Sequence, residues 1–296
     1  MELQKIKCLT IFTDVKHHYS RVKQTRGWVI DQVLSTLLSQ LHEYYPVLFQ
    51  EVSIDDIKQA VYHKADKIKD IDKRDSSIDI TRLLYECYPE FEYFHNHHPE
   101  TGKRKHQYPL VQYRCYKGRL IIHAYGEVIP LIEHWLLRSE SRISHRTVQI
   151  RHELQDIGVM DKYLHYRMYD WIPLSNDDYH KWREHYLMRD RLKLLEQKLK
   201  AYLYYSCDTF GCQLHEADVK SDIILINEVK QIKSYHDATG FNILYRTNVQ
   251  LPDRFALGRG SSLGFGTTRM SQWQGETDPK DREKRVKQGV QENIFS

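Results

Sequence analysis

The sequence has little cysteine and no long apolar run, and these shortages exclude several classes of protein. Its five cysteines among 296 residues are odd in number and scattered, so the sequence indicates neither a disulfide framework nor a zinc knuckle. The closest pair, Cys207 and Cys212, is spaced C-x4-C. No apolar stretch approaches the roughly 18 residues of a membrane-spanning helix, and the amino-terminal residues lack the order of a signal peptide. We therefore expect a cytoplasmic protein with no membrane partner.

The glycine motifs that hold nucleotide cofactors are also missing. The segment LPDRFALGRGSSLGFGTTRM, residues 251–270, contains Gly258, Gly260, Gly264 and Gly266. It matches neither the P-loop nor G-x-G-x-x-G, and we expect no cofactor. Such a segment allows backbone N–H groups to approach an anionic polymer, with charge added by Arg254, Arg259 and Arg269. A glycine-bent hairpin that packs closely on a helix fits the spacing equally well.

Tyrosine, histidine and basic residues are plentiful. The chain has 21 tyrosines, 17 histidines, and 44 lysines and arginines against 40 acidic residues. Aromatic rings interleaved with cationic groups suit the binding of single-stranded nucleic acid. A slightly basic protein without a nucleic-acid role has the same composition, so composition alone leaves both open.

Hydrophobic periodicity predicts an α+β first half. The predicted elements are a strand at 5–13, a helix at 27–41, a hairpin at 110–125 and a helix at 127–137. The helix at 27–41 rests on apolar residues at i, i+3 and i+4, and the hairpin on two β-prone runs joined by two residues. This order is close to the ferredoxin-like βαββαβ plan. We interpret residues 45–90 as an insertion.

The second half repeats strands and a long helix. The predicted strands are 147–154, 162–172, 222–227 and 240–250, and the helix runs from an Asn176–Asp178 cap to about residue 205. Arg189, Lys193 and Lys200 share one helix face, which suits either phosphate contact or simple solvation. The predicted domains are 1–140 and 141–272, followed by a charge-dense tail at 273–296.

Four histidines gather in one segment before the hairpin: His95, His97, His98 and His106. A metal site needs further ligands, but only Glu92 and Glu100 flank the cluster. Solvated loop histidines are a second interpretation. A third is metal-free RNA cleavage, in which imidazoles transfer protons and neighbouring cations neutralise the phosphate while the 2′-hydroxyl attacks the adjacent phosphorus.

Two motifs carry a resemblance to a known family. The first motif is HNH at 95–97 followed by YPLVQYR at 108–114, and the second is FNILYRTNVQLPDRFALGRGSSLGFG at 241–266. Both resemble motifs of the CRISPR-associated repeat-processing endoribonucleases of Cas family six, b-type. The likeness covers 1–42 and 90–270. It implies two tandem ferredoxin-like (RAMP) domains, each an antiparallel sheet with helices on one face. It also implies metal-independent cleavage of CRISPR precursor RNA within its repeats, leaving a 2′,3′-cyclic phosphate and a 5′-hydroxyl.

The resemblance also implies site residues. The histidines of HNH fall on His95 and His97, and the tyrosine of YP falls on Tyr108. We expect His97 to act as general base, His95 as acid or second base, and Tyr108 and Lys105 as stabilisers of the phosphate. A competing catalytic cluster is His17, His18, Tyr19 and Lys23. The expected RNA-binding residues are Arg26, Arg104, Arg114, Arg189, Lys193, Lys200, Arg254, Gly258, Arg259, Gly260, Ser261, Gly264 and Gly266.

Two other functions compete with this one. A RAMP-type subunit that holds guide RNA without cutting it has the same fold, because fold does not determine chemistry. A metal phosphodiesterase that uses His95, His97 and a distant carboxylate is the third hypothesis. Besides repeat RNA, the candidate partners are other subunits of a CRISPR effector complex and a second copy of the chain.

Overall fold

A computed structural model describes the two halves of the chain and little of the segment between them. The described residues are 3–16, 22–44, 46, 87–88, 93, 108–116, 119–138, 141–185, 187–233 and 238–272. They fall into two compact units, Leu9–Arg151 and His152–Ser296 with Met1–Cys8. The predicted domain limits and the predicted tail stay predictions. Among the described helices, none is long and apolar enough to cross a membrane.

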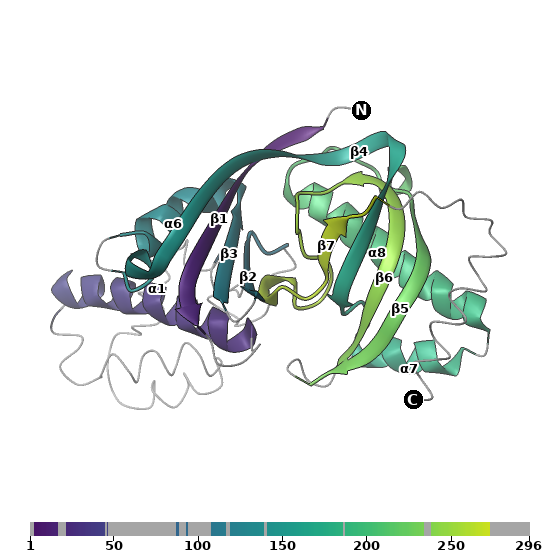
Figure 1. Cartoon of the computed structure of the whole chain (residues 1–296), viewed down its shortest axis with the longest axis horizontal. Coiled ribbons are helices and arrows are strands. Elements are labelled where there is room, and N and C mark those ends of the chain that lie inside the picture. The colour runs from purple at the N-terminus through teal and green to yellow at the C-terminus, as the bar shows by residue number, and fades with distance from the viewer. Residues whose placement is uncertain are drawn as a thin grey trace. The chain divides into compact units, whose positions relative to one another are not determined.

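The unit Leu9–Arg151 follows the βαββαβ order that the sequence predicts. Its elements are β1 (Gln4–Lys16), α1 (Val22–Tyr44), β2 (Val111–Tyr116), β3 (Arg119–Tyr125), α6 (Ile129–Leu136) and the start of β4 (Thr147–Trp171), with single 3-10 turns at Gly126–Val128 and Ser144–Arg146. The strands are ordered β2–β3–β1–β4. This is the strand order of a ferredoxin-like domain, and Figure 1 shows α1 and α6 beside its strands.

The core of this unit comes from the apolar stripe of α1. Val29, Val33, Leu37 and Leu41 are buried at helical spacing, and α1 contacts β2 and α6. The stripe turns toward the sheet because residues three and four apart share one face of a helix. The predicted helix at 27–41 is therefore confirmed, and α1 extends beyond both of its ends.

Strand β1 changes its buried face where it passes from one unit to the other. Ile6 and Cys8 are buried at alternate positions, and the alternation restarts at Leu9 and continues through Ile11. A strand exposes successive side chains to opposite faces, so two adjacent buried residues mark a change of face. The division between the units also falls between Cys8 and Leu9.

The second unit has the same ferredoxin-like order of elements, except that a glycine-rich segment stands in place of the second helix. It contains β4, α7 (Asn176–Glu184), α8 (Met188–Thr209), β5 (Ser221–Ile232), β6 (Ala238–Gln250) and β7 (Thr267–Met270), with 3-10 turns at Glu216–Asp218 and Ser261–Leu263. The strand order is β7–β4–β6–β5. The glycine-rich segment, residues 251–266, joins β6 to β7 and occupies the place in the chain of the second helix of a ferredoxin-like domain. The predicted α+β class with antiparallel sheets is confirmed.

Three predictions about this unit are wrong. The strands expected at 147–154 and 162–172 are one strand, β4. The register of its pairing with β6 shifts after Val159 and again after Met168. The helix expected from 176 to about 205 is two helices, because His185 is extended at the end of α7. Ser175, rather than Asn176, is the N-cap of α7: its side chain accepts a hydrogen bond from the N–H of Asp178 in a capping box.

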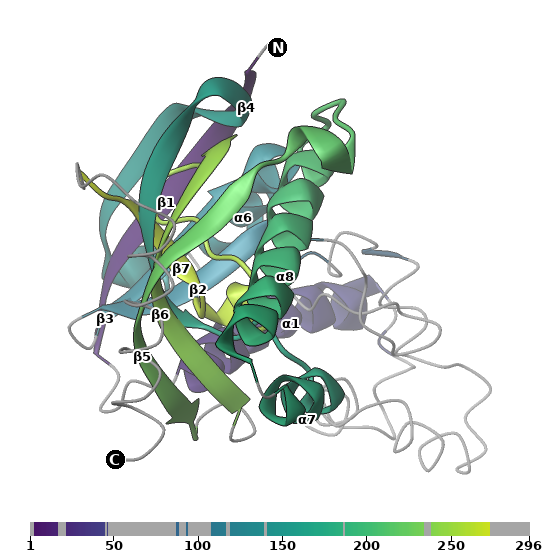
Figure 2. The ribbon, with the colours of Figure 1, turned by 90° about the vertical axis from the view of Figure 1, so that its right-hand side faces the viewer.

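The core of the second unit lies between α8 and the sheet. The apolar stripe of α8 is buried at Leu192, Leu195, Leu199 and Leu203, and α8 contacts β5. Figure 2 shows α8 running along one face of the strands. Aromatic rings complete the core, with Trp182 edge-on to Phe241 at a centroid distance of 5.5 Å.

Candidate nucleic-acid interface

Most of the predicted catalytic residues lie outside the described part of the chain. These are His95, His97, Lys105, His17, His18 and Tyr19, and Arg104 of the RNA-binding set lies outside it too. Lys23 and Arg26 belong to α1, but their side chains are also outside the described part. Their predicted roles stay predictions.

Tyr108 and Arg114 are the described members of the first unit's predicted site, and both are buried. Tyr108 and Arg114 are 9% and 7% exposed. Arg114 lies on β2, and its Nη2 donates to Oε1 of Gln112 at 3.4 Å. Tyr108 lies three residues before the start of β2. The buried strand that the sequence predicts behind the histidine segment is therefore present, and Tyr108 belongs to the short stretch that leads into it.

The glycine-rich segment uses many of its backbone N–H groups within the chain. Gly266 donates to the carbonyl oxygens of Tyr169 and Asp170, Leu257 donates to Gly266, and Arg259 donates to Ile172. The bonds to Tyr169, Asp170 and Ile172 tie the segment to the end of β4, and the bond between Leu257 and Gly266 lies within the segment. Amides committed to carbonyls are not available to an anion, which favours the hairpin interpretation for this part of the segment.

Two of the glycines are required by close packing. Gly258 has φ of +94°, and a Cβ there would meet the Trp171 ring at 2.9 Å. Gly266 has φ of +72°, and a Cβ there would overlap the carbonyl oxygen of Leu257. Both conditions exclude other residues, since an L-residue is strained at positive φ even in open space. Gly260 and Gly264, also at positive φ, flank the 3-10 turn Ser261–Leu263, and Ser261 is buried.

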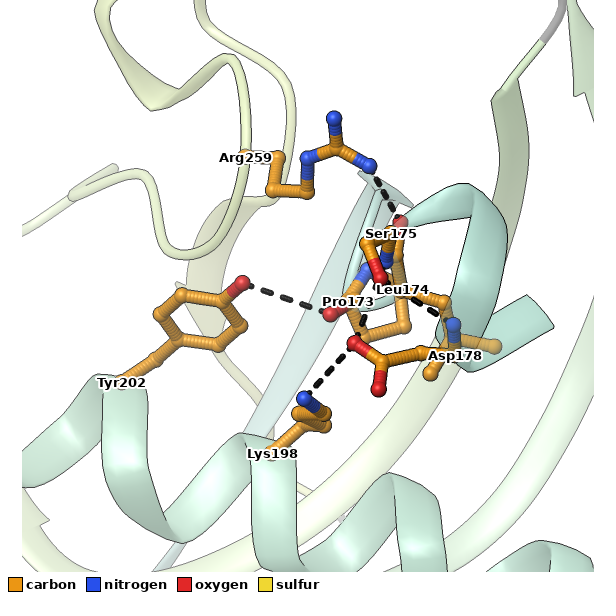
Figure 3. A network of polar contacts seen from close by, with 7 residues as sticks. All are labelled: Pro173, Leu174, Ser175, Asp178, Lys198, Tyr202 and Arg259. Atoms are coloured by element: carbon orange, nitrogen blue, oxygen red, sulfur yellow. Dashed lines mark hydrogen bonds and ion pairs between the residues drawn. The ribbon is translucent and has the colours of Figure 1, made fainter. Parts of the chain in front are cut away.

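The half-buried side chain of Arg259 also anchors the segment. Its Nη1 donates to the carbonyl oxygen of Leu174 at 2.7 Å, as Figure 3 shows. The same stretch of chain is held by Tyr202, whose hydroxyl donates to the carbonyl of Pro173 at 3.3 Å. Lys198 pairs with Asp178 at 2.8 Å. The connection from β4 to α7 is thus fixed from α8 on one side and from the glycine-rich segment on the other.

The predicted basic face of α8 is present and solvated. Arg189 and Lys193 are exposed and Lys200 is half-buried. Arg189 has a side-chain exposure of 75%, and its ion pair among the described residues is a long one, 3.8 Å, with the neighbouring Asp190. Arg254 likewise pairs with its exposed neighbour Asp253 at 3.4 Å. These cations remain accessible to a phosphate, and their contact with RNA stays a prediction.

A second cationic surface lies on the sheet of the second unit, and the sequence analysis missed most of it. It consists of His165, Arg167 and Tyr169 of β4, Arg246 of β6 and Arg269 of β7; we name it the arginine face. Tyr166 and Met168, which alternate with its β4 members, are buried. Cross-strand register places Arg246 opposite His165 and Arg269 opposite Arg167. The signal in the sequence was the alternation of polar and apolar residues in HYRMY, residues 165–169.

Two features of the arginine face favour the neutral form of His165. Burial and the positive charge of Arg246 both lower the pKa of His165. Arg246 itself pairs with Asp222 at 2.8 Å and lies over the ring of Tyr163 at 4.9 Å. A guanidinium group that binds both a carboxylate and an aromatic ring is held in one orientation. Within the described residues, no group of three or more His, Cys, Asp or Glu side chains is placed to hold a metal ion.

Comparison with known proteins connects this architecture to one family. The model of the Cas6b N-terminal domain matches residues 82–162, and that of the Cas6b C-terminal domain matches residues 158–271. No curated protein shows significant similarity to the chain.

Two solved structures share the fold. A crystal structure of Cas6b has a TM-score of 0.59 at 17% identity and covers 90% of this chain and 100% of its own. A crystal structure of the CRISPR RNA processing endoribonuclease Cas6b has a TM-score of 0.55 at 16% identity, with the same coverage of both chains. The consecutive domain matches, on a fold of two ferredoxin-like units, show that the chain belongs to the Cas6b family.

Proposed function

We propose that this protein is an endoribonuclease that cleaves precursor CRISPR RNA within its repeats to produce guide RNAs. The observation that carries the proposal is the consecutive match of the Cas6b N- and C-terminal domains over residues 82–271. A similar solved structure is described as a CRISPR RNA processing endoribonuclease. The exposed cations of α8 and of the arginine face supply the positive charge that an RNA backbone requires.

The chemistry that we propose needs no metal ion. His97 accepts the proton of the 2′-hydroxyl, and the 2′-oxygen forms a bond to the adjacent phosphorus. The bond from phosphorus to the 5′-oxygen breaks, and His95 gives that oxygen a proton. The products are a 2′,3′-cyclic phosphate and a 5′-hydroxyl. Lys105 and Tyr108 stabilise the charge that develops on the phosphate.

The experiment is cleavage of repeat RNA in excess chelator, beside the same RNA with a 2′-deoxy sugar at the scissile nucleotide. We expect the natural RNA to be cut and the deoxy RNA to remain intact. His97→Ala and His95→Ala should each lower the single-turnover rate on the order of 100-fold or more while RNA binding persists. His17→Ala is the matched control, since it tests the competing cluster.

Three outcomes would contradict the proposal and favour another function or mechanism. Cleavage of the deoxy RNA would overturn the attack by the 2′-hydroxyl. Recovery of activity on adding Mn²⁺ or Zn²⁺ to a chelated, inactive sample would show a metal phosphodiesterase. Binding of repeat RNA with no product after a long incubation would show a guide-binding subunit.

A further inference from the structure

Two arginines stand directly opposite each other on the arginine face. Arg167 of β4 and Arg269 of β7 are register partners in an antiparallel pair, so both side chains leave the sheet on the same face. Both residues are exposed. The Cβ atoms of directly opposed residues lie about 5 Å apart, which brings two positive charges within reach of one small anion.

Neither guanidinium of this pair has an ion pair among the described residues. Arg246 on the same face differs, because Asp222 neutralises it at 2.8 Å. Like charges directly opposite each other on a sheet destabilise it. The Arg167–Arg269 pair is therefore a local cost to folding, and an anion bound between the two groups would offset it.

An exposed aromatic ring lies beside the pair. Tyr169 is two residues from Arg167 on the same face of β4, opposite Thr267 of β7, and is 41% exposed. Within the described part of the chain its ring stacks on no other ring or cation. Tyr163 on the same strand is 43% exposed, but Arg246 already covers one side of its ring. Tyr169 is thus the ring that can receive a planar ligand next to the arginine pair.

We propose that Arg167, Arg269 and Tyr169 form a subsite for one unpaired nucleotide of RNA. The two guanidinium groups hold a phosphate, and the ring of Tyr169 stacks on the adjacent base. The identity of the ligand as RNA rests on the proposed function, but the subsite requires binding only and no cleavage. An unpaired base is required, because a base within a duplex has its faces covered by its neighbours and offers only its edges.

The test measures binding of an oligouridine, which has no stable secondary structure, and of a blunt RNA hairpin of the same charge. Tyr169→Ala should weaken oligouridine binding by about 5- to 150-fold, the range for loss of one stacked base. Tyr169→Phe should retain wild-type affinity, since it keeps the ring. Arg167→Gln and Arg269→Gln should each weaken binding and lower the slope of log Kd against log salt by about 0.7, as expected for one phosphate on a single strand.

Thermal unfolding separates this binding role from a structural one. Removing one charge of an opposed pair should leave the midpoint of unfolding unchanged or raise it, while RNA affinity falls. Arg142→Gln, which removes an exposed arginine from the other unit, is the matched control and should change neither. A lowered midpoint together with unchanged affinity would show that the pair is structural and would overturn the proposal.

The outcome for the subsite is independent of the outcome for cleavage. Unchanged oligouridine affinity in all three variants would refute the subsite even if the protein cuts repeat RNA normally. Equal losses on oligouridine and on the hairpin would refute a site for an unpaired nucleotide. Conversely, affinity that depends on Tyr169 in a protein without nuclease activity would support the subsite and reject the proposed function.

Discussion

Arg259 and Leu174 join the glycine-rich segment to the beginning of α7 through one hydrogen bond. The guanidinium Nη1 of Arg259 donates to the carbonyl oxygen of Leu174 at 2.7 Å, and the N–H of Arg259 donates to Ile172 at 3.1 Å. One residue therefore bonds twice to the chain between β4 and α7. We name these two hydrogen bonds of Arg259 the clamp. The clamp and the strand β7, which follows the segment, together position the glycine-rich segment.

Replacing Arg259 should loosen the segment. Arg259→Ala removes a hydrogen bond from a charged donor and should lower the free energy of unfolding by about 1–3 kcal/mol, measured by urea denaturation. Arg259→Lys should recover part of this loss. Arg254→Ala is the control in the same segment, because the ion pair of Arg254 within the described part of the chain is with its exposed neighbour Asp253, and it should change stability by less than about 0.5 kcal/mol. Equal losses in the Arg254 and Arg259 variants would contradict the clamp.

Gly266→Ala should destabilise the protein more than Gly211→Ala. Both glycines have positive φ, +72° and +75°, but a Cβ on Gly211 meets nothing within 4 Å, whereas one on Gly266 overlaps the Leu257 carbonyl. Gly211→Ala therefore measures backbone strain alone, about 1–2 kcal/mol. Gly266→Ala adds a steric clash, so its loss of stability in thermal unfolding should exceed that value, or the variant should fail to fold. A Gly266 variant as stable as the Gly211 variant would show that the segment repacks freely.

The N-cap of α7 should contribute measurable stability. The Ser175 hydroxyl accepts from the N–H of Asp178 at 3.1 Å, so Ser175→Ala should cost about 1 kcal/mol in chemical denaturation. Asn176→Ala, at the first position inside α7, is the control and should change stability little. A larger loss from the Asn176 variant would restore the original prediction of an Asn176 cap.

Asp178 should make stability depend on acid pH. The hydrogen bond from Lys198 holds the pKa of Asp178 below its ordinary value of 3.8. A carboxyl whose pKa is depressed by folding stabilises the protein above its unfolded pKa, and the contribution is lost as pH falls through the folded pKa. Asp178→Asn should therefore lower the unfolding midpoint near neutral pH, with a smaller difference from the wild type below about pH 4. A difference that is constant from pH 7 to pH 2 would contradict this linkage.

Cys212 should be the cysteine of the second unit that reacts with iodoacetamide at the lowest pH. A hydrogen bond from the Cys207 thiol lowers the pKa of Cys212, and the same interaction together with burial raises the pKa of Cys207. The thiolate is the reactive form, so alkylation of Cys212, followed by mass spectrometry, should begin at a lower pH than alkylation of Cys207 or Cys8. Cys207→Ala removes the donor and should move the alkylation profile of Cys212 to higher pH. An unchanged profile in that variant would rule out the hydrogen bond as the cause.

Local periodicity was enough to predict most helices and strands. The α1 stripe and the hairpin of β2 and β3 follow from residues close together in the chain, and both are confirmed. The helix break at His185 and the Ser175 cap were missed, although Ser175 and Asp178 have the spacing of a capping box. Continuous β4 was missed because its middle contains Gly158 between Asp156 and Asp161, a composition that resembles a turn, whereas pairing with β6 keeps Gly158 and Val159 extended.

The sequence by itself determined the α+β class, the ferredoxin-like order of elements and the family motifs, since all three depend on residue types at short, regular spacings. The tertiary structure decided that Arg167 and Arg269, more than a hundred positions apart, lie opposite each other, because only the register of β4 with β7 brings them together. The tertiary structure also decided that Gly258 and Gly266 are required where the chain packs closely. That role depends on which atoms surround each Cα, and distant parts of the chain supply those atoms.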